Sequence, residues 1–154
     1  MGEVYYKLIS NNKKATYEYF IESRIEAGIV LKGTEVKAIR MGRGSIKEAY
    51  AEIKNGEVFI NGMNISPYSK GNRYNEDPLR TRKLLLHKRE IKKLDRMVQQ
   101  KSYTLVPMKL YINDAGKIKV EIALGKGKKM HDKRATLAKK DAQRRVEQAL
   151  SDKY

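Results

Sequence analysis

The fold is decided by residues 104–124, which read TLVPMKLYINDAGKIKVEIAL. Apolar and polar residues alternate on both sides of the turn-forming residues 113–116, and this period of two is typical of β-strands with one buried face. The stretch therefore predicts a β-hairpin in which two apolar rows pair, Val106, Met108, Leu110 and Ile112 against Ile118, Val120, Ile122 and Leu124.

Two other segments carry the same alternation. Odd positions from 15 to 31 are mostly apolar, which predicts one long strand with a single core face and a bend near Gly28. Tyr17 and Tyr19 share that face, so we expect both to pack inside. Asn55 and Gly56 lie between two more alternating runs and predict a second hairpin.

Helical spacing appears twice. In residues 35–41, Val36 and Ile39 recur on one face, with Thr34 as the expected N-cap and Gly42 as the stop. After a polar loop at 66–82, a longer helix is predicted whose apolar seam runs through Leu84, His87, Ile91, Leu94 and Val98. The sequence thus predicts a mainly β, α+β domain over residues 1–125 and a basic C-terminal tail over 126–154.

The net charge indicates the class of partner. The chain has 34 Lys and Arg against 18 Asp and Glu, +16 in 154 residues, which attracts polyanions and favours nucleic acid. A membrane surface is less favoured, because it calls for a basic helix with a bulky apolar face. With no Cys and two His, we expect neither a disulfide nor a metal or cofactor site. The absence of a signal-peptide pattern predicts a cytoplasmic protein.

The tail admits two interpretations. Residues 126–154 contain ten Lys or Arg and four Asp or Glu, with good helix propensity but a thin apolar stripe of mostly small residues. Such a segment is either a solvated basic extension, or it is disordered alone and becomes helical on an anionic surface. Gly125 and Gly127, as an expected hinge before the basic block, favour the second interpretation.

Several motifs occur together in order: NKKATYEYFIESRIEAGIVLKGTEVKAIR at 12–40, DPLRTRKLLLHKREI at 77–91, TLVP at 104–107 and GKGKKMHDKR at 125–134. Together they resemble the small protein B (SmpB) family, the bacterial SsrA-binding proteins that partner transfer-messenger RNA (tmRNA). The resemblance implies an oligonucleotide-binding (OB) type β-barrel that binds the tRNA-like domain of tmRNA and stands where a tRNA anticodon arm would. It also implies a tail that becomes helical in the empty mRNA channel and decoding centre of a stalled ribosome. Elongation factor Tu would be reached only indirectly, through aminoacylated tmRNA.

Site residues follow from the same resemblance. It assigns tmRNA binding to Asn12, Lys13, Glu26, Lys37, Arg40, Arg80, Arg82, Lys83, Leu85 and His87. It assigns ribosome binding by the tail to Gly127, Lys128, Lys129, His131, Asp132, Lys133 and Arg134. From its surroundings, His131 is a stacking candidate. Tyr103 and Tyr111 are stacking candidates on the barrel, and so are Tyr17 and Tyr19, although the core parity of the last two favours packing.

Alternatives remain at several positions. Glu26 has even parity in its predicted strand and therefore faces away from the core side, where it is either a solvated carboxylate or an acceptor for base amino groups and ribose hydroxyls. His87 either packs on its helix or contacts RNA. Arg80, Arg82 and Lys83 are either flexible phosphate-binding cations of the polar loop or simply solubilising.

Two rival functions bear on the whole chain. A general tRNA- or rRNA-binding, ribosome-associated OB-fold protein is the alternative to the adaptor. An RNA-cleaving enzyme is disfavoured, because His131 and Asp132 are sequence neighbours that do not face each other. We expect a monomeric, non-enzymatic protein with no membrane partner.

Overall fold

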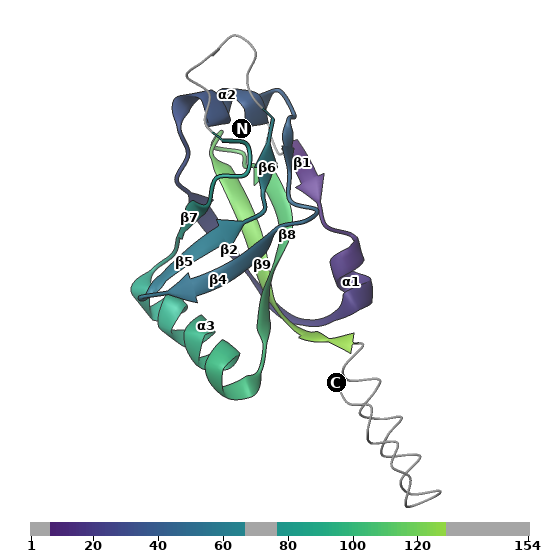
Figure 1. The fold of residues 1–154 in the computed structure, drawn as a ribbon, viewed down its shortest axis with the longest axis vertical. Coiled ribbons are helices and arrows are strands. Elements are labelled where there is room, and N and C mark those ends of the chain that lie inside the picture. Colours follow the sequence, from purple (N-terminus) through teal and green to yellow (C-terminus); the bar gives the residue numbers. More distant parts are fainter. Residues whose placement is uncertain (1–6, 67–76, 129–154) are drawn as a thin grey trace, which may run out of the picture.

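The computed structural model describes residues 7–66 and 77–128, and within them three helices accompany nine strands (Figure 1). The elements in chain order are β1 (Lys7–Asn11), α1 (Lys14–Glu18), β2 (Tyr19–Ile29), α2 (Gly33–Arg40), β3 (Gly44–Ser45), β4 (Tyr50–Lys54), β5 (Glu57–Asn61), β6 (Asn64–Ile65), β7 (Arg82–Leu85), α3 (Lys88–Lys101), β8 (Thr104–Ile112) and β9 (Ile118–Gly127).

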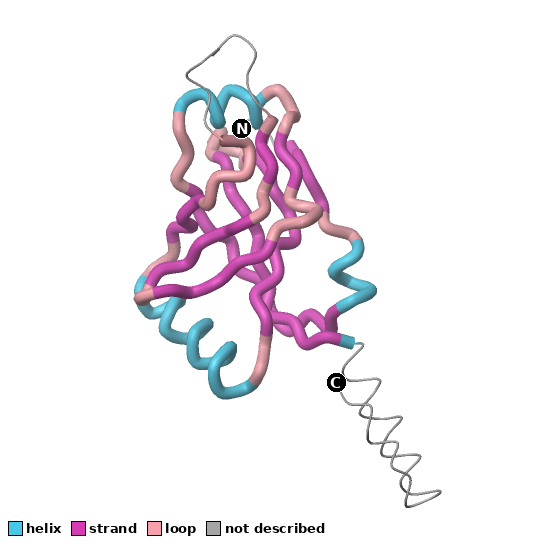
Figure 2. The backbone as a smooth tube through the Cα atoms, viewed as in Figure 1, coloured by secondary structure: helices cyan, strands magenta, loops and turns pink. Residues whose placement is uncertain are grey.

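One curled antiparallel sheet forms the body of the protein. Its strand order is β1-β8-β9-β2-β7-β5-β4, while β3 and β6 form a small separate pair. The edge strand β4 also lies against β8, so the sheet bends round on itself (Figure 2). Figure 1 shows α2 near one end of this body and α3 near the other. The predicted mainly β, OB-like α+β fold is confirmed.

Both predicted hairpins are present. β8 pairs with β9, and β4 pairs with β5 across Asn55 and Gly56. Both turn residues have positive φ, 51° and 76°, the left-handed conformation that Asn and Gly tolerate best. Their chemistry therefore determines where the chain reverses.

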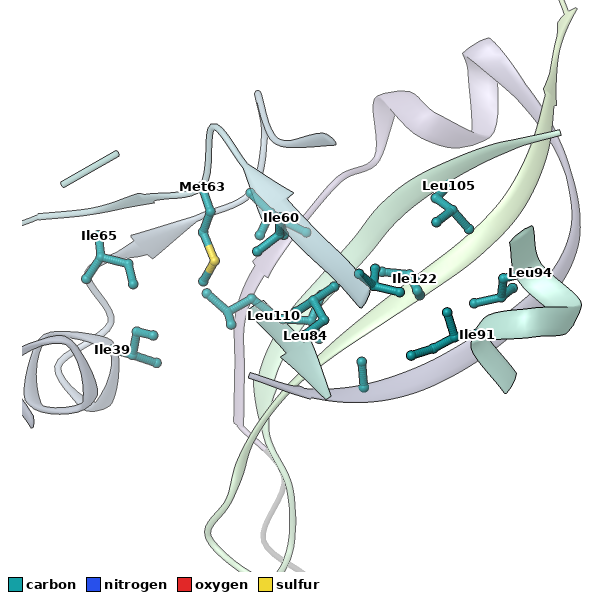
Figure 3. Packing of buried hydrophobic residues seen from close by; sticks show 14 of the residues in the cluster. Ile39, Ile60, Met63, Ile65, Leu84, Ile91, Leu94, Leu105, Leu110 and Ile122 are labelled. Atoms are coloured by element: carbon teal, nitrogen blue, oxygen red, sulfur yellow. The ribbon is translucent and has the colours of Figure 1, made fainter. Parts of the chain in front are cut away.

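The main core runs between the two helical ends. It is built from inward rows of β2, β5, β7, β8 and β9, with Ile39 of α2 at one end and Ile91 and Leu94 of α3 at the other (Figure 3). Central members such as Ile60, Leu110 and Ile122 are fully buried, which makes this cluster the main apolar contribution to stability.

The prediction of one long strand from residue 15 is wrong in two respects. Residues 14–18 form α1, which buries Ala15 but leaves Tyr17 79% exposed. β2 then bulges between Ile21 and Ser23, not at Gly28. Because a bulge inserts one extra residue, the odd-numbered side chains before it and those after it lie on opposite faces of the sheet.

The bulge creates a second apolar cluster. Ile25 packs against the main core, whereas Tyr19 and Ile21 pack against a cluster of Ala15, Val106, Met108 and Ala123. This second cluster lies on the outer side of β8, β9 and β2, where α1 covers it.

The long predicted helix begins later than expected. Arg82–Leu85 form strand β7 between β2 and β5, and α3 starts at Lys88 with His87 as its N-cap. The Glu90 carboxylate accepts a hydrogen bond from the His87 backbone N–H at 2.8 Å, which defines this start. In α2 the N-cap is Lys32 rather than Thr34.

Gly125 and Gly127, which were expected to form a hinge, both belong to strand β9. β9 continues to Gly127, and Gly125 is buried within it. A Cβ at Gly125 would lie 3.0 Å from the Tyr19 Cβ, so this glycine permits close strand packing.

Among residues 7–66 and 77–128, no helix is long and apolar enough to cross a membrane.

Candidate nucleic-acid interface

The outer side of β2, β8 and β9 divides into two parts. One end is covered by α1, as described above. The other end carries residues that alternate with the core rows and form what we call the outer face: Arg24, Glu26, Lys109, Tyr111, Lys119 and Glu121. Strand alternation thus places the candidate carboxylate Glu26 among cations.

Glu26 is exposed and held in position. Its carboxylate accepts a hydrogen bond from the hydroxyl of Tyr111, whose ring is buried. Glu121 lies directly opposite Glu26 on β9, a pairing of like charges that is unfavourable by itself. The guanidinium of Arg24 offsets it from 3.6 Å. Glu26 therefore presents an oriented carboxylate that can accept hydrogen bonds from base amino groups or ribose hydroxyls.

Leu85 extends the outer face onto β7. Gly28 pairs with Leu85, and a Cβ at Gly28 would lie only 3.4 Å from the Leu85 Cβ. Leu85 nevertheless remains 50% exposed. An apolar side chain this accessible is available to contact a ligand.

A groove of about 390 Å³ adjoins Leu85, with Leu31, Val36 and Ile118 among its apolar lining. The cationic residues that line it are Arg40, Lys117 and Lys119. Arg40 is anchored, since its Nη2 donates to the Gly116 carbonyl at 3.0 Å. Lys37 is exposed one turn earlier on α2.

The packing alternative for His87 is wrong. His87 is exposed at the start of α3 and lies before the helix, so it does not belong to the apolar seam. The position is open to a ligand on the side of the molecule where β7 ends.

The structure contradicts the RNA-binding role that was predicted for Arg82. Its side chain is fully buried and donates two hydrogen bonds to Glu35, from Nε at 2.9 Å and Nη2 at 2.8 Å. Its Nη1 donates to the Met63 carbonyl at 2.7 Å. Because β7 is a central strand and not part of a loop, Arg82 points into the protein and has no surface for a phosphate.

The neighbours of Arg82 are also partnered. Arg80 binds the same Glu35 carboxylate, with its Nη2 2.6 Å from Oε1. Lys83 lies on the opposite side of β7 from Arg82, and its Nζ is 2.6 Å from Glu57 Oε2. The interpretation of 80–83 as a flexible cationic loop is therefore wrong, although Arg80 and Lys83 remain partly accessible.

Glu35 is the buried acceptor of this cluster. Burial by itself would raise the pKa of Glu35. The hydrogen bonds from Arg80, the Lys32 amide and Arg82, together with the Arg82 charge, outweigh burial and hold the pKa of Glu35 below its ordinary value. Sequence reasoning missed Glu35, although it lies four residues before Ile39 and hence on the buried side of α2.

Asn12 and Lys13 lie at the opposite end of the outer face. The Asn12 backbone N–H donates to the Met108 carbonyl at 2.8 Å, and its side-chain amide donates to the Pro107 carbonyl at 3.1 Å. These bonds fix the loop before α1 against β8. Lys13 is exposed beside it.

The start of the tail is attached to α1 and β2. Lys128 Nζ donates to the Thr16 carbonyl at 2.9 Å and lies 5.1 Å above the Phe20 ring. Gly127 is the last residue of β9. The remaining predicted tail residues, Lys129, His131, Asp132, Lys133 and Arg134, lie outside the described residues.

The two barrel tyrosines do not offer free stacking faces. Tyr111 is only 7% exposed, so the prediction that it stacks on a base is wrong. Tyr103 has Lys126 Nζ 4.9 Å from its ring centre. Its hydroxyl donates to the Glu22 carboxylate, and this bond raises the pKa of Tyr103 above its ordinary value.

The chain is similar to a family of known proteins. The family model described as "SmpB protein" matches residues 9–152. The chain belongs to the SmpB protein family. The resemblance noted in the sequence is thereby confirmed over the folded body and the tail.

Individual relatives align over nearly the whole chain. The SsrA-binding protein of Acetivibrio thermocellus is 55% identical over 148 residues, 96% of each chain. The SsrA-binding protein of Bacillus subtilis is 56% identical over 146 residues, 95% of this chain and 93% of its own. That of Alkaliphilus oremlandii is 58% identical over 144 residues, 94% and 92% of the two chains.

A solved structure shares the fold. A chain from the work described as "tmRNA-SmpB: a journey to the center of the bacterial ribosome" superimposes with a TM-score of 0.63 and 45% identity. The match covers 76% of this chain and 82% of that one.

Eight of the ten predicted RNA-binding residues fall into three groups, while Lys83 pairs with Glu57 and His87 is exposed before α3. Glu26 and Leu85 lie on the outer face and its extension, with Lys37 and Arg40 on the neighbouring helix α2. Asn12 and Lys13 lie at the far end of the outer face, and Arg80 and Arg82 bind Glu35. In the described part of the chain, no three His, Asp or Glu side chains are grouped so that they could hold a metal ion.

Proposed function

We propose that this protein is an RNA-binding adaptor that binds the tRNA-like domain of tmRNA and delivers it to stalled ribosomes for trans-translation. The observation that carries this proposal is family membership over residues 9–152, with relatives named SsrA-binding proteins aligned along nearly the full chain. The structural match to a tmRNA-SmpB chain agrees with it.

The outer face carries the side chains that would bind RNA. Glu26, oriented by Tyr111, would accept hydrogen bonds from bases or ribose hydroxyls and so contribute selectivity. Leu85 would offer an apolar contact, while Lys37 and Arg40 would bind phosphates. His87, Asn12 and Lys13 would extend the interface at its two ends.

The tail would supply the contact with the ribosome. In this proposal the body stands where a tRNA anticodon arm would, and the tail enters the empty mRNA channel and decoding centre. Gly127, Lys128, Lys129, His131, Asp132, Lys133 and Arg134 are the residues proposed for that contact. A net +6 over residues 126–154 suits a channel lined by RNA.

The family is one of adaptors, so no catalytic step is assigned to any residue here. A protein that acts on the ribosome would work in the cytoplasm, and it would meet elongation factor Tu only through aminoacylated tmRNA. The second candidate function is general tRNA or rRNA binding, which the net charge of +16 favours by itself.

A competition assay separates the two functions. The purified protein is bound to labelled tRNA-like domain of tmRNA at physiological salt, and excess unlabelled bulk tRNA is added. We expect the complex to survive, since oriented contacts such as Glu26 add selectivity to a charge-driven grip. Displacement of the labelled RNA by the excess bulk tRNA would contradict the adaptor function and favour general RNA binding.

A further inference from the structure

A second concave site lies at the α1 end of the outer face. It is a cleft of about 320 Å³, lined by Asn12, Lys13, Tyr17, Arg24, Met108 and Lys109 among others. Its walls come from three parts of the chain that are far apart in sequence: the loop and helix at 11–17, strand β2 and strand β8. The sheet topology therefore assembles it.

Tyr17 is the unusual member of this cleft. α1 turns Ala15 into the second apolar cluster at 0% exposure, and Tyr17, two residues later, is left 79% exposed. A ring this exposed contributes little to the stability of the domain. Its accessible aromatic face is suited to stacking against another flat ring.

Cations converge on the cleft from separate elements. Lys13 precedes α1, Arg24 lies on β2 and Lys109 lies on β8. Arg24 is shared with Glu121, whose Oε1 lies 3.6 Å from it, whereas the lining residues of the cleft include no carboxylate. The charge of the cleft itself is therefore positive.

The cleft is also preorganised. The two hydrogen bonds from Asn12 to the backbone of Pro107 and Met108 hold its loop wall against its β8 wall. Met108 is the bulge residue at which the pairing of β8 with β9 shifts, and this shift leaves Lys109 on the outer face.

An exposed aromatic ring surrounded by cations is the arrangement that binds single-stranded RNA, with a base on the ring and phosphates on the cations. We propose that this cleft binds one unstacked base of the tRNA-like RNA on Tyr17, with its flanking phosphates on Lys13, Arg24 and Lys109. This inference rests on the proposed function, because it assigns a subsite to the same RNA.

The position of the cleft supports one continuous interface. Arg24 lies two residues before Glu26 on β2, and Lys109 lies two residues before Tyr111 on β8. A strand of RNA that contacts Glu26 can continue along the outer face to Tyr17. Thr16, which also lines the cleft, accepts the hydrogen bond from Lys128, so the interface also reaches the start of the tail.

The test compares two substitutions at one position in the full-length protein. Tyr17→Phe keeps the aromatic ring and Tyr17→Leu removes it at similar bulk. With the tRNA-like domain at physiological salt, we expect Tyr17→Phe to bind within twofold of the unchanged protein. We expect Tyr17→Leu to bind about 5- to 150-fold more weakly, the loss of one base–aromatic stack. Both should have unchanged melting temperatures, which circular dichroism checks.

Salt titrations separate stacking from charge. Tyr17→Leu should keep the log–log salt slope, whereas Lys109→Gln should reduce its magnitude by about 0.7 to 0.9, the value for one phosphate. Lys54→Gln is the matched control, because Lys54 lies on the edge strand β4 with 65% of its side chain exposed. It should leave affinity and slope unchanged.

The outcomes are distinguishable. Equal binding by Tyr17→Leu and Tyr17→Phe would overturn the stacking site while the adaptor function stands. An unchanged slope for Lys109→Gln would overturn its phosphate contact. If the unchanged protein does not prefer the tRNA-like domain to bulk tRNA, the proposed function fails and the subsite fails with it.

Discussion

Glu35 offers the sharpest test of what holds α2 on the sheet. Its carboxylate accepts five hydrogen bonds, one from the Lys32 amide and two each from Arg80 and Arg82, at 2.6 to 3.1 Å. The side chains of Glu35 and Arg82 are 4% and 0% exposed. Glu35→Gln keeps the shape but leaves the Arg82 charge buried without a counter-charge. Removing one partner of such a pair destabilises proteins by about 3 to 5 kcal/mol.

Urea unfolding at pH 7 measures this loss. With an m-value of about 2 kcal/mol per M, the midpoint should fall by about 1.5 to 2.5 M. The control Glu18→Gln changes an exposed carboxylate on α1 and should stay within about 0.5 kcal/mol. A double-mutant cycle with Arg82→Met isolates the pair, because the buried charge is then absent from the double variant.

The pH dependence has a definite sign. The pKa of Glu35 lies below its ordinary value of 4.5 in the folded protein, so ionised Glu35 stabilises the fold above pH 4.5. This contribution is lost as the pH falls through the folded-state pKa. The stability difference between the unchanged protein and Glu35→Gln should therefore shrink on acidification. A loss below about 1 kcal/mol at pH 7, or a fully additive cycle, would refute the account of the buried pair.

Three further predictions address the turns, the interface and the tail. Gly62→Ala should destabilise by about 3 kcal/mol, because φ is +76° and the new Cβ would lie 2.7 Å from the Glu48 carbonyl oxygen. Gly116→Ala has φ +79° but open space, so it should cost only about 1 kcal/mol by thermal unfolding, and equal losses would contradict the clash. Binding of the tRNA-like domain should weaken with salt at a log–log slope of roughly −3.5 to −4.5 if about five phosphates are neutralised, whereas a flat titration would count against a phosphate-dominated interface. Removal of residues 129–154 should preserve that binding and abolish tagging on stalled ribosomes, and full tagging by the truncated protein would rule out the proposed role of the tail.

Local patterns predicted a large part of the fold. The two hairpins follow from alternation and from the turn chemistry of Asn55 and Gly56. Helix spacing located α2 and most of α3, and the outward position of Glu26 followed from the parity of β2. These features depend on residues close together in the chain, and a local pattern can therefore specify them.

The errors share one cause. Residues 82–85 fit a helical seam in the sequence, yet they form β7 because β2 and β5 offer their unpaired backbone groups on both sides. The odd-numbered apolar residues of β2 serve two clusters because a bulge opposite β9 changes which face they meet. In both cases the partner strands are distant in the sequence, so the local pattern of the segment cannot indicate them.

The candidate site divides in the same way. The sequence by itself determined the strong positive charge, the alternating strands and the family motifs, since all three are properties of residue type and order. Only the tertiary structure decided that Arg82 is buried against Glu35, that Tyr17 is exposed beside Arg24 and Lys109, and that Tyr111 orients Glu26. Those outcomes depend on contacts between strands and helices distant in the chain, where burial and charge pairing are set by neighbours that no local pattern contains.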